Sequence, residues 1–276
     1  MDDFKILTIQ DISCVGQCSM TVALPILSAC GLETAVLPSA VLSTHTAGFQ
    51  DFTVKDLTEE MPKIIEHWKK EGIRFRALYT GYLGSAEMIS YVLTIRNELL
   101  TDDGIFIFDP AMADDGKLYP AFDEAYVREM KKLCAVADVV LPNLTEACFL
   151  TDTPYKEDFN GRWVNGLIDS LRGLGAKQVV LTGVSFTDHS TGVASSTGGA
   201  TYYYHHIKYP KGCHGTGDVY SSAFTGAFMR GMTLHDAARV AADFTARCIG
   251  YTQENYPDHW YGVKFEPVLP ELIEKL

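Results

Sequence analysis

A short glycine-rich segment late in the chain carries the residue types best suited to chemistry: Gly215, Thr216, Gly217 and Asp218. Glycines let backbone N–H groups turn outward and approach an anion closely. The helix expected over 218–230 would point the positive end of its dipole at the same place. An anion site beside a fixed carboxylate suits phosphoryl transfer, in which the carboxylate takes a proton from the attacking hydroxyl. The alternative is a tight turn in which Thr216 or Asp218 only caps a helix.

Other phosphate-binding motifs are absent. No G-x-x-x-x-G-K-[ST] sequence occurs, because Gly116-Lys117 is followed by Leu118. The glycines at 215 and 217 do not extend to G-x-G-x-x-G, because Tyr220 occupies the last position. The set of protein-kinase motifs is also missing. These absences argue against a P-loop enzyme and against a simple dinucleotide dehydrogenase.

Polar side chains also stand where several expected strands end. This set is Asp11, Tyr82, Asp109, Asn143 and Thr182. Because open α/β sheets bind ligands at the carboxyl ends of their strands, we expect these residues to share one edge of a sheet. Asp109 together with Glu146 would offer hard oxygen ligands for Mg²⁺. The alternatives are turn chemistry at Asp109-Pro110 and Pro142-Asn143, and a core role for Tyr82.

Short β-type runs alternate with longer helical patterns through most of the chain. Strands are expected over 4–9, 34–38, 77–81, 105–109, 138–141 and 178–182. Helices are expected over 19–30, 57–71, 86–100, 122–134, 144–150, 163–174, 218–230 and 234–249. This alternation predicts a largely parallel sheet with helices on both faces. An aromatic run over 201–206 follows Gly198-Gly199 and predicts a hairpin. No linker or repeat divides the chain, so we expect one α/β domain over 1–276.

The composition excludes several classes of protein. Of the 276 residues 47% are hydrophobic, which is usual for a globular chain and too high for a disordered one. The 23 basic and 35 acidic side chains give a net charge of −12, so nucleic acid and anionic membranes are not expected partners. The start of the chain is acidic and carries no export signal, and no apolar run is long enough to span a bilayer. We therefore expect a cytoplasmic protein.

The seven cysteines are scattered, and we expect them to be reduced in a cytoplasm. Cys14, Cys18 and Cys213 could come together near the glycine-rich segment, which would indicate metal or redox chemistry. No C-x-x-C sequence occurs, so the interpretation we favour is small buried thiols.

The motif over 215–218 and five further segments resemble the vitamin B6 (pyridoxal, pyridoxine and pyridoxamine) kinases of the ribokinase superfamily. The five segments occur in family order and are 9–11, 43–46, 80–85, 108–112 and 141–146. The resemblance implies a ribokinase-like three-layer sandwich, ATP and Mg²⁺ as cofactors, and a homodimer. It leaves open whether a monovalent cation such as K⁺ is needed. It also implies that Asp218 is the catalytic base and that Gly215, Thr216 and Gly217 form the anion hole.

On the substrate side, the resemblance implies that Thr46 contacts the pyridine nitrogen and that Tyr82 lies beside the ring. Leu42 and Cys18 match positions in the apolar wall of the pocket. Many members of the family have serine where this chain has Asp11. We hypothesise that Asp11 faces the substituents of the ring and favours a cationic amine, as in pyridoxamine.

On the nucleotide side, the resemblance implies that Asp109, Asn143 and Glu146 organise the phosphates and Mg²⁺, with Asp109 and Glu146 at the metal. Tyr119 matches a tyrosine in the loop over the phosphates. Thr182 matches a nucleotide contact that follows a strand.

The expected function is ATP-dependent phosphorylation of the hydroxymethyl group of a B6 vitamer. One alternative is the hydroxymethylpyrimidine kinase of thiamine synthesis, because its substrate also carries an amino and a hydroxymethyl group. Another is a non-catalytic ligand-binding homologue, which would be marked by loss of the base or the anion hole. Both are present here. A sugar or nucleoside kinase is disfavoured because no polar cluster suits several sugar hydroxyls.

Overall fold

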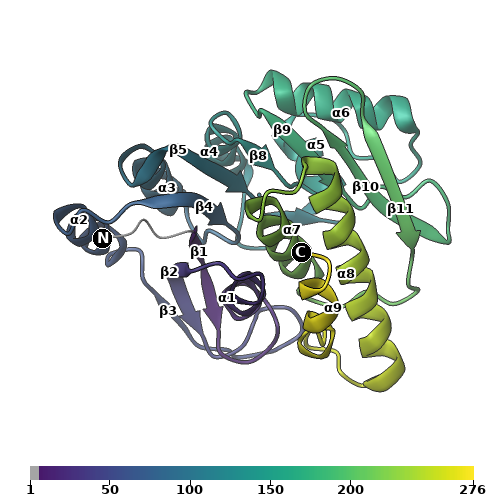
Figure 1. Ribbon diagram of the computed structural model, residues 1–276, viewed down its shortest axis with the longest axis horizontal. Coiled ribbons are helices and arrows are strands. Elements are labelled where there is room, and N and C mark those ends of the chain that lie inside the picture. The colour runs from purple at the N-terminus through teal and green to yellow at the C-terminus, as the bar shows by residue number, and fades with distance from the viewer. Residues whose placement is uncertain (1–5) are drawn as a thin grey trace.

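One mixed sheet forms the centre of the protein (Figure 1). The computed structural model describes residues 6–276, and its nine-stranded sheet has the order β11-β10-β9-β8-β5-β4-β1-β2-β3. Its strands are β1 (Ile6–Ser13), β2 (Thr34–Leu42), β3 (Val54–Asp56), β4 (Phe75–Thr80), β5 (Leu100–Phe108), β8 (Val139–Val140), β9 (Gln178–Thr182), β10 (Ser190–Ser196) and β11 (Tyr202–Ile207). The strand predicted over 4–9 is confirmed from Ile6 onward but continues to Ser13, so Asp11 lies within β1, in the part that pairs with the end of β2, and not after the strand; Phe4 and Lys5 lie outside the described residues.

The middle of the sheet is parallel, from β2 through β1, β4, β5 and β8 to β9. At one edge β3 runs antiparallel to β2, and at the other the predicted hairpin, β10 and β11, continues the sheet in antiparallel pairing. Parallel neighbours require crossover connections, which here contain helices. The parallel strands therefore all end at the same edge, as predicted for the polar residues that follow them.

Helices cover both faces of the sheet, which confirms the predicted three-layer sandwich (Figure 1). One face carries α2 (Met61–Lys70), α3 (Ala86–Glu98), α4 (Glu124–Cys134), α5 (Leu144–Leu150) and α6 (Gly161–Gly173). The other carries α1 (Met20–Ala29), α7 (Thr216–Met229), α8 (Leu234–Asn255), the 3₁₀ turn η1 (Glu266–Val268) and α9 (Leu269–Ile273). Successive side chains of a strand alternate between these faces, so Leu78 packs in the first core while Ala77 and Tyr79 pack in the second.

Side-chain caps determine where several helices begin. The caps of α3, α4 and α6 each accept a hydrogen bond from a backbone amide of the first turn and are Ser85, Asp123 and Asn160. The helix predicted over 57–71 begins only at Met61. The reason is that the Asp56 carboxylate accepts a hydrogen bond from the Thr58 amide at 2.7 Å and forms a turn first.

The C-terminal part of the chain differs most from the predicted elements. Helix α8 continues to Asn255, beyond the predicted end at 249. On this extension the Thr252 hydroxyl accepts a hydrogen bond from the Lys264 amide at 2.8 Å, which ties the following segment to the helix. A small ribbon of β6 (Ala113–Asp114) and β7 (Lys117–Leu118) was not predicted either, and neither were β3 and α9. These elements are too short to show a hydrophobic period.

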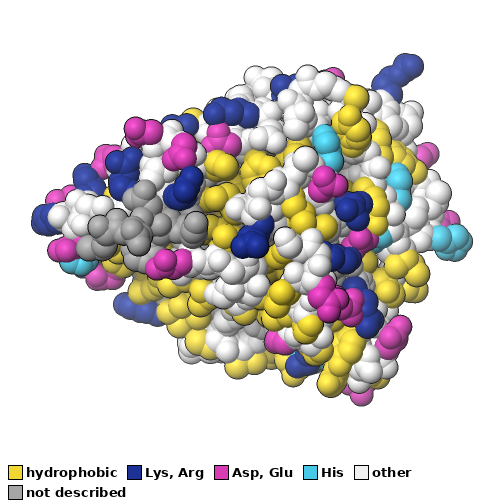
Figure 2. Space-filling model, in the orientation of Figure 1, with side chains coloured by type: hydrophobic (Ala, Val, Ile, Leu, Met, Phe, Trp, Pro, Cys, Tyr) yellow, Lys and Arg dark blue, Asp and Glu magenta, His cyan; other side chains and the backbone are white. Residues whose placement is uncertain are grey.

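Charges are interspersed over the face seen in Figure 2, where Lys and Arg side chains lie next to Asp and Glu side chains. Among the described residues, oppositely charged side chains form ion pairs such as Lys69–Glu98 at 2.7 Å and Lys131–Asp152 at 2.6 Å. No broad basic patch is visible among the described residues on this face. Within residues 6–276, no helix combines the length and apolarity that crossing a bilayer would need.

Candidate active site

The glycine-rich turn lies against the loop that joins β1 to α1. Gly215 has φ +76° and stands immediately before α7. A β-carbon at Gly215 would lie 1.9 Å from the Gln17 carbonyl oxygen, so only glycine permits this approach. The sequence showed the glycine motif but not its partner, Gln17. The turn and the first loop are thereby held together at the carboxyl edge of the sheet.

Asp11 and Asp218 belong to the two segments that meet there. Asp11 lies near the end of β1, is 5% exposed, and accepts a hydrogen bond from the Ser13 hydroxyl at 3.0 Å. Burial raises the pKa of Asp11, and hydrogen bonds from Ser19 and Ser13 oppose that rise. Asp218 lies in the first turn of α7 and is partly exposed. Desolvation raises the pKa of Asp218 to about 7, and the charge on Asp11 adds to the rise.

Asp109 follows β5 and is a third carboxyl group in this region. Asp11, Asp218 and Asp109, together with Glu146 described below, are called the row of carboxyl groups. The Asp109 side chain is 7% exposed, and Oδ2 accepts a hydrogen bond from the Ser221 hydroxyl at 2.6 Å. Burial raises the pKa of Asp109 to about 8; the Ser221 hydrogen bond lowers it and the Asp218 charge raises it further. Ser221 was not among the predicted site residues, although it comes one helical turn after Asp218 and so shares its side of α7.

Asn143 and Glu146 form a capping box at the start of α5. The Asn143 Oδ1 accepts a hydrogen bond from the Glu146 amide at 2.9 Å, and Glu146 Oε2 accepts one from the Asn143 amide at 2.8 Å. Glu146 Oε1 also accepts a hydrogen bond from the Met112 amide at 3.2 Å. Burial, followed by the charge on Asp109, raises the pKa of Glu146 well above its usual value. Both residues therefore have a structural role besides any role toward a ligand.

Asp109 and Glu146 fit a magnesium ion that takes most of its ligands from elsewhere. They are two buried carboxyl groups, the charge of Asp109 raises the pKa of Glu146, and no ion pair between either of them and a Lys or Arg is found within residues 6–276. The same residues contain no group of three or more His, Cys, Asp or Glu side chains that could hold a metal. Mg²⁺ commonly binds one or two carboxylates and completes its shell with water and substrate phosphates. This donor set meets that requirement.

Two further predicted residues border this row of carboxyl groups. Thr182 ends β9, is half-buried, and donates its backbone amide to the Pro142 carbonyl at 2.9 Å, beside Asn143. Tyr119 follows β7 with 37% exposure and feels the charges of Glu146 and Asp109, which contribute to the rise in its pKa after burial.

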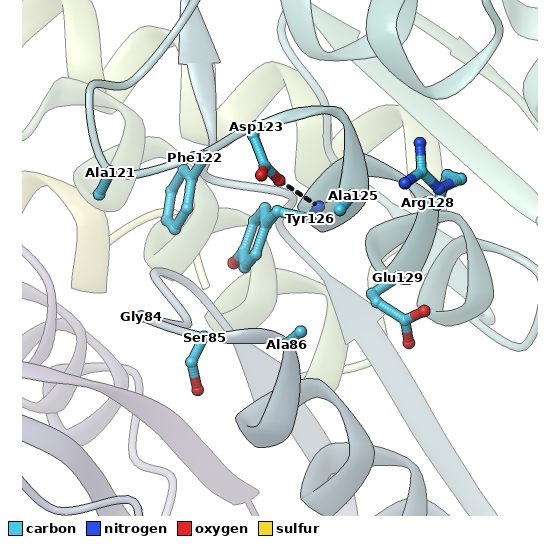
Figure 3. Close-up of a pocket in the computed structure, with 10 residues that line it drawn as sticks. All are labelled: Gly84, Ser85, Ala86, Ala121, Phe122, Asp123, Ala125, Tyr126, Arg128 and Glu129. Atoms are coloured by element: carbon cyan, nitrogen blue, oxygen red, sulfur yellow. Dashed lines mark hydrogen bonds between the residues drawn. The ribbon is translucent and has the colours of Figure 1, made fainter.

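Tyr82 is half-buried after β4 and packs against an aromatic side chain that the sequence did not single out. Its ring centroid lies 5.3 Å from that of Phe122, and Phe122 stacks on Tyr126 at 3.9 Å. Phe122 also lies 6.5 Å from Tyr119, so it joins the predicted substrate side to the predicted loop over the phosphates. Figure 3 shows Phe122 and Tyr126 with their rings side by side, and Asp123 capping α4.

A cavity of about 450 Å³ opens next to these rings, between the N-terminal ends of α3 and α4 (Figure 3). Its lining includes Ser85, Phe122 and Arg128 and contains none of the predicted site residues. The predicted site residues therefore lie outside this cavity.

The remaining residues predicted to contact the substrate differ in how deeply they are buried. Leu42 is buried and Cys18 is half-buried; desolvation and the charges of Asp218 and Asp11 raise the pKa of the Cys18 thiol. Thr46 is exposed in the loop after β2, and no hydrogen bond joins its hydroxyl to another described residue. Leu42 and Cys18 are therefore covered at least in part by neighbouring residues, whereas the Thr46 hydroxyl is exposed and has no hydrogen-bond partner among the described residues.

Two histidines that the sequence analysis did not select lie beside these residues. Buried His45 accepts a hydrogen bond from the Ala47 amide at Nδ1 and donates one from Nε2 to the Tyr261 carbonyl at 2.9 Å. Its ring centroid is 5.6 Å from that of His214, directly before the glycine turn. The two histidines are far apart in the sequence, so only the folded structure shows that they are neighbours.

The sequence predicted that Cys14, Cys18 and Cys213 are small buried thiols. The expectation that these thiols are buried is wrong for Cys14, which is exposed on the loop after β1, and Cys18 and Cys213 are half-buried.

Comparison with known proteins agrees with the fold and the motifs. Residues 24–261 match the family model described as phosphomethylpyrimidine kinase. A Bacteroides thetaiotaomicron protein that is assigned as a phosphomethylpyrimidine kinase and was crystallised with pyridoxal is 38% identical, with a TM-score of 0.93 and coverage of 98% of this chain and 96% of that one. Pyridoxal kinase from Lactobacillus plantarum is 30% identical, with a TM-score of 0.90 and coverage of 98% and 97%.

A curated relative is similar over a shorter stretch. Pyridoxal kinase from Dictyostelium discoideum is 29% identical over 189 residues, which is 66% of this chain and 60% of that protein. The chain therefore spans less than two thirds of the length of this relative.

Replacing Gly215 should disturb the contact between the glycine turn and the first loop. Gly215→Ala places a β-carbon 1.9 Å from the Gln17 oxygen at φ +76°, so we expect the free energy of unfolding to fall by about 2 kcal/mol or more. The matched control is Gly217→Ala, where no atom lies within 4 Å of the added carbon. Urea unfolding of both variants checks this, and equal stability of the two would contradict the geometry.

The carboxyl groups with raised pKa values should make the ligand-free protein less stable as the pH rises. Asp109 and Asp218 have usual pKa values of 3.8, which folding raises to about 8 and about 7. The folded state therefore holds more protons than the unfolded state between about pH 4 and about pH 8, and the free energy of unfolding falls across that window. Asp109→Asn should reduce the fall, whereas Asp188→Asn, at an exposed position, should not. Urea titrations across this window measure both, and identical slopes would show that Asp109 does not titrate in this way.

Proposed function

The chain belongs to the pyridoxal kinase and phosphomethylpyrimidine kinase family of the ribokinase superfamily, and on that premise we propose that it phosphorylates the hydroxymethyl group of a vitamin B6 vitamer with ATP. Membership makes it a kinase of this family. The observation that carries the finer proposal is the row of carboxyl groups from Asp11 to Asp218, which runs beside a glycine turn at a helix N-terminus. The pyridoxal found with the Bacteroides relative supports the same class of substrate.

Asp218 is proposed as the general base. A carboxyl group whose pKa is raised to about 7 can accept a proton near neutral pH. It would take the proton of the hydroxymethyl group while that oxygen forms a bond to the γ-phosphorus. The bond from the γ-phosphorus to the bridging oxygen then breaks and ADP leaves with the electron pair. The amides of Gly215, Thr216 and Gly217 would stabilise the charge on the transferred group.

The nucleotide is proposed to lie along the other end of the row. Asp109 and Glu146 would hold Mg²⁺, which when bound neutralises charge on the phosphate oxygens. Asn143 and Thr182 lie next to each other at the ends of adjacent segments and would contact the nucleotide. Tyr119 follows a short ribbon on the protein surface, where it would cover the phosphates and exclude water from the transfer.

The vitamer is proposed to lie between Asp11 and Tyr82, with Leu42 and Cys18 at its apolar side and Thr46 at the pyridine nitrogen. Tyr82 feels the charge of Asp11, which adds to the rise in the tyrosine pKa from burial, so the two side chains border the same region of the site. A cationic amine beside Asp11 would favour the ionised carboxylate against the effect of burial. This favours pyridoxamine over pyridoxal.

Hydroxymethylpyrimidine is the second candidate substrate. The family model itself is described as phosphomethylpyrimidine kinase, and the amino group of a pyrimidine would also suit Asp11. Both reactions would use the same base and the same anion hole, so only substrate preference separates them.

Substrate preference is the first prediction to check. An assay of ADP release with Mg·ATP should show faster turnover of pyridoxamine than of pyridoxal, pyridoxine or hydroxymethylpyrimidine. Asp11→Ser should lower the kcat/KM ratio of pyridoxamine to pyridoxal by about ten-fold or more, because a charged hydrogen bond is lost. Asp11→Asn, which keeps the shape, should do the same. An unchanged ranking in both variants would exclude this role for Asp11, and a preference for the pyrimidine would select the second candidate.

Removing the proposed base should abolish most turnover without unfolding the protein. Asp218→Asn cannot accept the proton, so we expect kcat to fall by about 100- to 10,000-fold. Circular dichroism and the thermal midpoint should stay close to those of the wild type, because the amide keeps the size of the side chain. Near-full turnover by a folded variant would show that the mechanism is wrong.

A further inference from the structure

We propose that Ser221 is a positioning residue that holds the Asp109 carboxylate in place for the nucleotide and its metal ion. The hydroxyl of Ser221 donates a hydrogen bond to Asp109 Oδ2 at 2.6 Å. This inference rests on the proposed function, because Asp109 has a task only if the protein binds a nucleotide with Mg²⁺.

The contact is short and closed to solvent. Ser221 is 2% exposed and Asp109 is 7% exposed, so water does not compete for the bond. A distance of 2.6 Å is short for a bond that a hydroxyl donates, and the bond would gain charge assistance once a bound cation ionises Asp109. The bond therefore selects one orientation of the Asp109 side chain.

Only one oxygen of Asp109 is used in this way. Within residues 6–276 the structure gives Oδ1 no hydrogen bond and no ion pair, while Oδ2 is taken by Ser221. A carboxylate held by one oxygen keeps the other available as a ligand. Hydrogen bonds of this kind orient the carboxylates that bind metals in proteins.

The same bond connects two elements that carry different parts of the proposed reaction. Asp109 follows β5, whereas Ser221 lies in α7, one turn after Asp218. Residues three apart on a helix lie on one side of it, so the helix presents the base and the Ser221 hydroxyl to the same region. The Ser221–Asp109 bond thereby keeps the proposed metal side at a constant place relative to the base.

The local sequence offers no simpler reason for a buried serine here. Serine is unfavourable inside helices because its hydroxyl competes for backbone groups, and the buried positions of α7 carry Ser222 and Thr225 as well as apolar residues. The next residue, Ser222, is also buried, but its hydroxyl lies 3.4 Å from the Tyr79 hydroxyl and does not contact Asp109. Ser222 is therefore a matched control of the same type and burial.

The test compares Ser221→Ala with Ser222→Ala by calorimetric titration of ADP into the full-length protein, with and without Mg²⁺. For Ser221→Ala we expect the Mg²⁺-dependent gain in ADP affinity to fall by about 10- to 100-fold, while affinity without Mg²⁺ stays unchanged. Ser222→Ala should match the wild type in both measurements. In steady-state assays, Ser221→Ala should need a correspondingly higher Mg²⁺ concentration for half-maximal rate.

A third arm asks whether Ser221 acts through Asp109. In an Asp109→Asn background, adding Ser221→Ala should cause no further loss of Mg²⁺-dependent ADP affinity. A further loss as large as in the wild-type background would overturn the proposal, and so would a Ser221→Ala protein that matches Ser222→Ala. A wild type that binds no ADP with Mg²⁺ would contradict the proposed function, and the inference with it. A wild type that binds, beside an unaffected Ser221→Ala, would contradict the inference alone.

Discussion

The crowding of like charges at one edge of the sheet is the constraint on which the rest of the structure depends. Asp11, Asp218, Asp109 and Glu146 form a row in which each of the last three feels the charge of the one before it. Desolvation raises the pKa of all four, and the charge of the preceding carboxylate adds to the rise at Asp218, Asp109 and Glu146. Hydroxyl and backbone N–H groups around the row donate hydrogen bonds that offset the cost of placing these carboxyl groups together. A bound cation or amine would further reduce the repulsion between them.

The donors come from elements that are far apart in the sequence. Ser13 ends β1, Ser19 precedes α1, Ser221 lies in α7, and the Met112 amide lies in the segment after β5. Parallel strands bring these segments to a common edge, since every crossover returns the chain to the same side. The close contact of Gly215 with the first loop then sets how near α7 can approach.

The two ends of the row differ in what surrounds them, which suggests a division of tasks. Asp11 lies among Tyr82, Cys18 and His45, an aromatic and partly apolar environment suited to a ring with a cationic substituent. Glu146 lies among backbone amides and Asn143, an environment suited to phosphate oxygens and a hard cation. Asp218 stands between them, where a hydroxyl on the ring and a phosphoryl group would meet.

The sequence by itself determined the parallel sheet, the three layers, the hairpin and the glycine motif, because each follows from the hydrophobic period, the turn residues or the spacing of residues near one another in the chain. It also placed Asp11, Asp109 and Asn143 at strand ends, since a strand's last apolar residue is visible in the chain. Only the tertiary structure decided that Ser221 contacts Asp109 and that Gln17 lies against Gly215. Those contacts join residues far apart in sequence, and their distances depend on how helices pack on the sheet, which no local pattern encodes.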